Sequence, residues 1–174
     1  VSGITMILKR WLMMGSRETK STPYNGLLPG VEMLVYDRLR EELDVHTLTQ
    51  AFEVMIKNNV DIINVSLGTS YYSEDFKKVV RKAIEQDITV ITSAGNTGSG
   101  AEVYPGSFGI PGVISVGSIN NDYTVSNIST VNENTNVFAP GDEIYTLRVN
   151  FIILTPCFPM VLRVEKRSTS QILY

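Results

Sequence analysis

Cysteine and histidine are almost missing from this sequence, whose 174 residues hold one of each, Cys157 and His46. A lone cysteine closes no disulfide within the chain, and neither residue has the companions that a zinc site requires. A basic surplus is also lacking, because 15 Lys and Arg stand against 18 Asp and Glu, giving a net charge of −3. No apolar run approaches the roughly 18 residues that span a bilayer. We therefore expect no nucleic-acid partner and no membrane partner, and we assign the sequence no metal and no cofactor.

The remaining composition is that of an ordinary globular domain. Apolar residues make up 43% of the chain and charged residues 19%. A chain of 174 residues is long enough for one domain with a sizeable core. No linker or internal repeat divides it, and we expect a monomer. Its first residue is Val rather than Met, which suggests a processed or partial chain.

Runs of β-branched and other apolar residues, bounded by Gly, Pro and Asn, recur along the chain. Such runs predict buried strands. They lie at 32–36, 61–67, 87–93, 113–118 and 136–139. The Gly- and Ser-rich segment 97–100 predicts a surface loop, and the segment 120–136, dense in Asn, Ser and Thr, predicts strands or loops at the surface.

Two segments between the first three of these predicted strands carry apolar residues at helical spacing. Asp44 or Thr47 is placed to cap a helix that runs to Asn58, and Ser73 is placed to cap a second helix. An alternation of strand and helix is typical of parallel sheets. We therefore predict an α/β fold with three layers, α/β/α, and a mostly parallel sheet. Near the beginning, residues 6–14 predict either a membrane-surface or partner helix, or a segment packed on the core.

Small residues follow two neighbouring strands of the predicted sheet. The first strand leads into Ser66-Leu67-Gly68, and the second leads through Ser93-Ala94-Gly95 to Asn96. Small residues let another backbone or a ligand approach closely, and parallel sheets place ligands beyond the carboxyl ends of their strands. The sequence therefore predicts a peptide-binding cleft with a hydrogen-bond donor, the Asn96 amide, at its floor. Alternatively, Asn96 is a turn residue that tolerates left-handed backbone.

Four short motifs in order resemble the subtilisin-like serine proteases. Residues 62–68 are similar to the family segment I-N-x-S-L-G, and residues 93–96 to A-A-G-N. Tyr104-Pro105 with residues 113–117 is similar to Y-P-x-x-x-x-V-I-x-V-G, and residues 137–141 match V-x-A-P-G. The resemblance covers residues 26–147, so we divide the chain into a subtilase-like core flanked by divergent segments at 1–25 and 148–174. It implies a subtilisin-like fold, here incomplete at both ends.

The resemblance implies a serine-type endopeptidase that hydrolyses peptide bonds by acyl transfer and is secreted or held at the cell surface. Asn96 matches the oxyanion-hole asparagine, whose side-chain N–H faces the developing negative charge. The expected partner is a polypeptide in extended conformation, paired with the first strand end. The second strand end would form the opposite wall of the pocket for the side chain before the scissile bond. The residues in these substrate-binding roles are Ser66, Leu67, Gly68, Ser93, Ala94 and Gly95, with Tyr104 near the rim of the pocket.

The catalytic Asp, His and Ser of that family have no match in this sequence. The nucleophile motif Gly-Thr-Ser-x-Ala does not follow Arg148, and His46 lacks the flanking Gly-Thr of the catalytic histidine. Gly68-Thr69-Ser70 contains the same three letters, but Tyr71-Tyr72 replace the small residues that should follow. Asp37 and Asp61 are expected in a loop and a turn rather than in a triad. We therefore predict a fragment without protease activity.

Two other interpretations are compatible with the sequence. One is a non-catalytic pseudoprotease that keeps the cleft and binds peptides. The other is an α/β nucleotide-binding module that uses the glycines between Gly95 and Gly100, although this spacing matches neither the dinucleotide fingerprint nor the P-loop.

Overall fold

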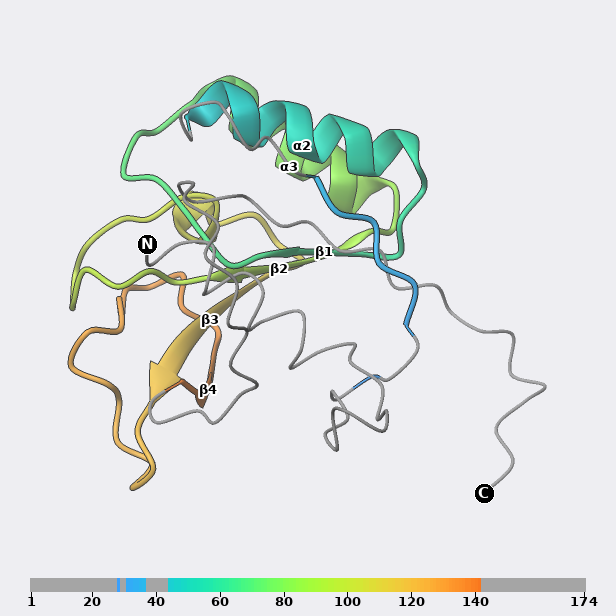
Figure 1. Ribbon diagram of the computed structural model, residues 1–174. Coiled ribbons are helices and arrows are strands. Elements are labelled where there is room, and N and C mark those ends of the chain that lie inside the picture. Colours follow the sequence, from blue (N-terminus) through green and yellow to red (C-terminus); the bar gives the residue numbers. More distant parts are fainter. Residues whose placement is uncertain (1–27, 29–30, 37–43, 142–174) are drawn as a thin grey trace, which may run out of the picture.

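Four parallel strands form a single sheet in this computed structural model, which describes residues 28, 31–36 and 44–141. The strands are β1 (Ile62–Val65), β2 (Thr89–Ser93), β3 (Val113–Ile119) and β4 (Val137–Pro140). Their order in the sheet is β1-β2-β3-β4, so strands that follow one another in the chain are also neighbours in space (Figure 1). The predicted α/β fold with a parallel sheet is confirmed.

Two helices cover the same face of this sheet, α2 (Val45–Lys57) and α3 (Glu74–Glu85) (Figure 1). Asp44 caps α2, because its carboxylate accepts a 2.7 Å hydrogen bond from the Thr47 N–H. Ser73 caps α3 by accepting from the Phe76 N–H at 3.3 Å. The prediction for Ser73 is confirmed, and of the two candidates for α2 it is Asp44 that acts as the cap.

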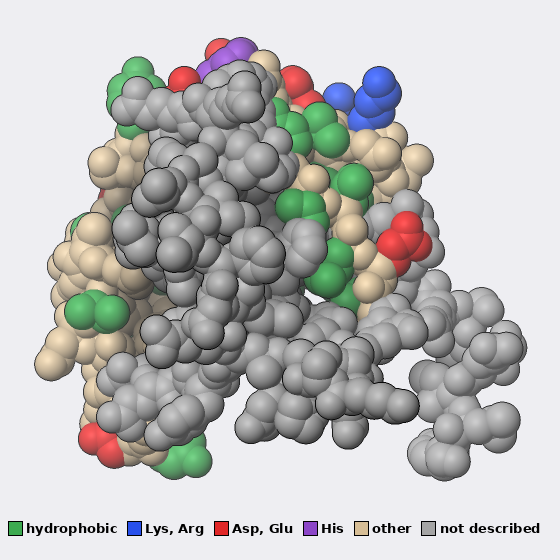
Figure 2. Space-filling model, viewed as in Figure 1, with side chains coloured by type: hydrophobic (Ala, Val, Ile, Leu, Met, Phe, Trp, Pro, Cys, Tyr) green, Lys and Arg blue, Asp and Glu red, His purple; other side chains and the backbone are tan. Residues whose placement is uncertain are grey.

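The hydrophobic core lies between the helices and the sheet. Phe52 of α2 and Phe76 of α3 are fully buried and meet edge to face, with ring centroids 5.5 Å apart. Beneath them the inward side chains of the strands, including Ile63, Val65 and Val90, are also fully buried. Close packing of this kind gives the sheet a fixed position relative to both helices. In the space-filling view, the Lys and Arg side chains visible on this face lie over the helical layer (Figure 2).

The strand predicted at 32–36 is wrong, because these residues have no regular secondary structure. Leu34 and Tyr36 pack against the core cluster instead, and the Tyr36 hydroxyl donates to Gln50 Oε1 at 3.4 Å. The apolar residues of the run are thus used for side-chain contacts with the helical layer rather than for a strand ladder.

Several other predictions fall outside the described residues. They concern the segment 6–14, Asp37 and the tail from Arg148 that includes Cys157. Among the helices that the structure describes, none has the length and apolar character needed to cross a bilayer.

Replacing Ser73 with alanine removes the cap of α3 and should lower the free energy of unfolding by about 1 kcal/mol. Ser70 is exposed three residues earlier, outside any helix, so Ser70→Ala is the matched control and should leave stability unchanged. Urea unfolding followed by circular dichroism measures both. Equal stability of the two variants would contradict the assignment of the cap.

Candidate functional site

The two strand ends singled out in the sequence lie side by side at one edge of the sheet. Strands β1 and β2 pair in parallel with Val65 opposite Thr92, so both end at the same level. The chain leaves this edge through Ser66 after β1 and through Ala94 after β2, on the left of Figure 1. The predicted adjacency of the two strand ends is confirmed.

Asn96 stands exposed at this edge. Within the part of the chain that the structure describes, its side-chain amide has no hydrogen-bond partner. Gly95 before it has φ +114°, a conformation that side chains rarely adopt, so the turn that presents the amide depends on glycine. An amide that is exposed and unpaired is free to donate to a ligand.

Thr130 holds the turn on both sides of Asn96. Its backbone N–H donates to the Gly95 carbonyl at 2.9 Å, and its Oγ1 accepts from the Thr97 N–H at 3.1 Å. The two threonine hydroxyls also lie 2.9 Å apart, within hydrogen-bond distance. Thr130 is completely buried. The backbone that carries Asn96 is therefore fixed from the residue before it and the residue after it.

The opposite side of the edge is held by the segment before the 3-10 helix η1 (Gly106–Phe108). Thr69 and Tyr104 exchange two backbone hydrogen bonds, at 3.0 and 2.8 Å. Ser66 Oγ accepts from the Asn64 side chain at 3.0 Å, and Leu67 is half-buried against the core. Gly68, which follows Leu67, is exposed, so its main chain is accessible from solvent.

The Tyr104 side chain points into the protein rather than toward solvent. It is 5% exposed, stacks on Phe108 with centroids 4.8 Å apart and meets Tyr72 edge to face at 5.4 Å. Its hydroxyl donates to the Glu102 carboxylate, and this bond, together with burial, raises the pKa of Tyr104 to about 12. The backbone of Tyr104 is thus the part next to the strand end. That Tyr104 borders the substrate pocket stays a prediction.

The glycines after Asn96 do not form a phosphate-binding loop. The Gly98 N–H donates to the Ile128 carbonyl at 3.3 Å, and the Gly100 N–H donates to the Val131 carbonyl at 2.9 Å. These backbone donors are therefore already used. A P-loop also leads directly into a helix, whereas residues 94–105 contain none. The nucleotide-binding interpretation of this segment is wrong.

The other reactive side chains considered in the sequence lie on three different segments of the structure. Ser70 is exposed in the loop after β1. His46 is exposed on the first turn of α2, where its Nε2 lies 2.9 Å from Gln50 Nε2. Asp61 stands just before β1, at the amino end of the strand, and its carbonyl accepts from the Thr89 N–H. Among the described residues, no three His, Cys, Asp or Glu side chains are grouped as a metal site would require.

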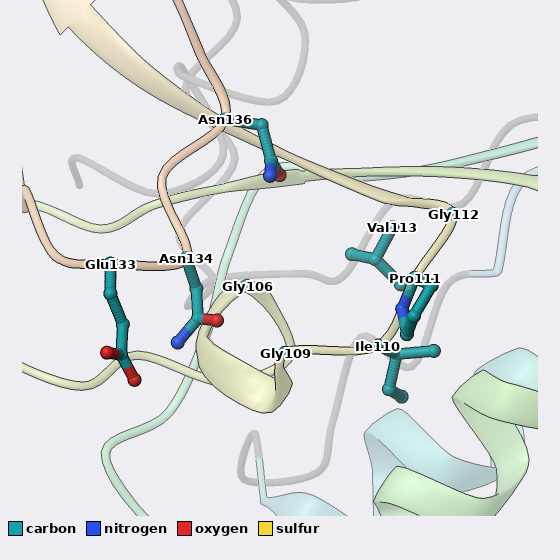
Figure 3. A pocket seen from close by; sticks show the side chains of 9 residues that line it. All are labelled: Gly106, Gly109, Ile110, Pro111, Gly112, Val113, Glu133, Asn134 and Asn136. Carbon is teal, nitrogen blue, oxygen red and sulfur yellow. The ribbon is translucent and has the colours of Figure 1, made fainter.

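A separate hollow of about 200 Å³ lies at the amino ends of β3 and β4 (Figure 3). Ile110, Pro111 and Val113 line one side of it, and the loop with Glu133 and Asn134 lines the other beside η1. Because this hollow lies at the amino ends of the strands, it is distinct from the edge that presents Asn96. Parallel sheets bind ligands at the carboxyl ends of their strands, where Asn96 is.

Thr130 and Val103 pack against the turn at Gly95, and neither residue was predicted from the sequence. Thr130 lies in the polar stretch predicted at the surface, yet Ser126 and Ser129 beside it are also buried. A polar composition does not distinguish hydroxyls that face solvent from hydroxyls that bind backbone inside the protein. Val103 directly precedes the Tyr104-Pro105 motif, and that position is the only signal that could have drawn attention to it.

The chain is similar to known proteases in sequence and in fold. The family model described as the subtilase family matches residues 12–171. Subtilisin NAT of Bacillus subtilis subsp. natto is 37% identical over 101 residues, covering 56% of this chain and 26% of the relative. The minor extracellular protease Epr of Bacillus subtilis is 32% identical over 62% of this chain and 16% of its own length. An intracellular serine protease of Paenibacillus polymyxa is 32% identical over 68% of this chain and 38% of the relative.

The chain therefore spans well under half the length of these curated relatives. Solved structures show the same fold at lower identity. The self-cleaved protease domain of PatA aligns with a TM-score of 0.66 at 17% identity, over 87% of this chain and 57% of that one. The S41 psychrophilic protease aligns with a TM-score of 0.64 at 22% identity, over 79% and 52%. These likenesses, with the parallel sheet and its helices, agree with a three-layer α/β/α fold.

Replacing Thr130 with valine keeps its shape but removes the hydroxyl that accepts from the Thr97 N–H. Loss of a typical intramolecular hydrogen bond costs about 0.5–1.5 kcal/mol, so we expect a loss of unfolding free energy in that range and faster hydrogen exchange at Thr97. Thr130→Ser keeps the hydroxyl and should preserve slow exchange. Identical exchange at Thr97 in the two variants would show that the hydroxyl does not hold the turn.

The raised pKa of Tyr104 predicts a loss of stability in alkali. In the unfolded chain this hydroxyl ionises near its ordinary pKa of about 10, whereas in the folded protein it keeps its proton until about pH 12. The contribution of the Tyr104 hydroxyl to the free energy of unfolding is therefore fully present below pH 10 and is lost as the pH rises to 12. Ultraviolet titration of the protein minus that of Tyr104→Phe isolates the group. Glu102→Gln should bring its pKa down, and a titration near 10 in the unaltered protein would contradict the hydrogen bond.

Proposed function

This chain belongs to the subtilase family of serine-type peptidases, and from that premise we propose that it carries the substrate cleft and oxyanion donor of a serine endopeptidase. The reaction of the whole protein would be peptide-bond hydrolysis by acyl transfer. The part played by the described residues is to hold an extended polypeptide and to place its carbonyl group against Asn96.

The observation that carries this proposal is the free amide of Asn96 beside the exposed main chain of Gly68. Strands β1 and β2 bring the two together at one edge. A peptide laid along the segment from Ser66 to Gly68 would add main-chain hydrogen bonds, as an extra strand does. Its carbonyl oxygen would then face the Asn96 amide, which donates most strongly when that oxygen becomes an oxyanion.

We further propose that the chain by itself binds peptides without cleaving them. The general base of such a reaction is a histidine, and the only histidine of these 174 residues is His46. That side chain is exposed on α2 and lies against Gln50. A non-catalytic peptide-binding protein is the second candidate, and it is supported by the same cleft.

The partner under this proposal is a polypeptide in extended conformation, bound by a monomer. For location we propose secretion or the cell surface, which the extracellular protease of Bacillus subtilis among the relatives supports. The relatives also include the intracellular serine protease of Paenibacillus polymyxa. Fractionation of cells and medium tests the location, and recovery of the chain only from the cell interior would contradict the proposal.

A product-like peptide with a free terminal carboxylate tests the Asn96 donor. Its affinity should exceed that of the same peptide with a terminal amide by on the order of tenfold, because a hydrogen bond to a charged group contributes about 1.5–3 kcal/mol. Asn96→Ala should abolish that preference. Asn127 is likewise exposed, so Asn127→Ala is the matched control and should retain it. Fluorescence anisotropy of labelled peptides gives the affinities.

The same protein should neither turn over a chromogenic peptide nor react with a fluorophosphonate. If one serine were labelled stoichiometrically, the chain would hold an activated nucleophile and the binding-only proposal would be wrong. If neither peptide bound at millimolar concentration, the substrate-cleft proposal would be wrong as well.

A further inference from the structure

One side chain, Val103, fills the space between the two strand ends. A Cβ atom built on Gly68 would lie 2.6 Å from Val103 Cγ1, and a Cβ built on Gly95 would lie 2.6 Å from Val103 Cγ2. The two methyl groups of this valine therefore contact the two walls of the proposed cleft, one each. Val103 is only 8% exposed, so little of the space between the walls remains open beneath the surface.

The backbone around Val103 is held tightly. The Val103 N–H donates to Ser107 Oγ at 2.9 Å, and the Ser107 N–H donates back to the Val103 carbonyl at 2.9 Å. The Asn132 side chain donates to the same Ser107 hydroxyl at 2.9 Å. The next residue, Tyr104, exchanges two backbone bonds with Thr69. A peptide that enters the cleft therefore meets a fixed obstacle rather than a side chain on a mobile loop.

A second atom, Thr130 Oγ1, further limits the space beside Gly95. The Cβ built on Gly95 would lie 2.8 Å from Thr130 Oγ1, a hydroxyl that already binds Thr97. Any substrate side chain that points at the Gly95 wall thus meets a valine methyl and an occupied hydroxyl. Both groups are buried, so an aromatic ring entering at this wall would have to displace one of them.

We propose that Val103 is a specificity-determining residue that restricts the substrate to a small side chain, such as Gly, Ala or Ser, at the position entering between the two walls. This inference rests on the proposed peptide-binding function and specifies its substrate class. In that function the position is the residue just before the scissile bond. A longer side chain would have to displace the valine or remain outside the pocket, and each loses packing.

The test uses the full chain and two product-like peptides that differ only in their last residue, Ala or Phe. The unaltered protein should bind the Ala peptide more tightly by on the order of tenfold, within the range by which pockets discriminate small differences in size. Val103→Gly should remove or reverse this preference, because the Phe peptide should bind more tightly. The affinity of the Ala peptide should change by less than about threefold. Val103→Ala keeps the β carbon, so its preference for the Ala peptide should be intermediate between that of the unaltered protein and that of Val103→Gly.

Val125 is exposed in the loop after β3, so Val125→Ala is the matched control for Val103→Ala and should keep the preference for Ala. If the glycine variant does not fold, as judged by its thermal melting, the alanine variant decides. If the unaltered protein and the Val103 variants bind both peptides with the same ratio of affinities, the inference is wrong and the proposed function stands. Absence of binding in every variant would overturn both.

Discussion

The parallel pairing of β1 with β2 is the constraint on which the site depends. With Val65 opposite Thr92, both strands end at one level, and the loops that follow them have to share one edge. A slip of the register would separate Gly68 from Asn96 along the strands. The buried face keeps the register, because Ile63, Val65 and Val90 lose their places in the core if either strand moves.

The loops at this edge are themselves supported by segments distant in the sequence. Thr130 binds the turn around Asn96, while Tyr104 binds the loop around Gly68 through its main chain. Val103 then packs against both glycines. The walls of the cleft are therefore spaced by contacts of uncharged groups, which are insensitive to salt, and the backbone turn that carries the exposed amide is already in place. Preorganisation of this kind is what an oxyanion donor requires.

The helices, the strands from β1 onward and the pairing of the two strand ends were predictable from the sequence. Caps such as Ser73 and apolar periodicity are local signals, and they act over a few residues. Thr130 and Val103 were not predictable, because their roles arise from contacts with Gly95 and Gly68 that the fold creates and that no local sequence pattern reveals. The run at 32–36 was predicted as a strand because β-branched and apolar residues serve equally well in a strand and in side-chain packing.

The most direct test of the central claim is an NMR titration of the ¹⁵N-labelled chain with a product-like peptide. If the two strand ends form one peptide site, the side-chain amide of Asn96 and the backbone amide of Gly68 will shift together, with the same dissociation constant. Saturable binding that shifts residues at the amino ends of the strands, and leaves both of these groups unchanged, would contradict the account.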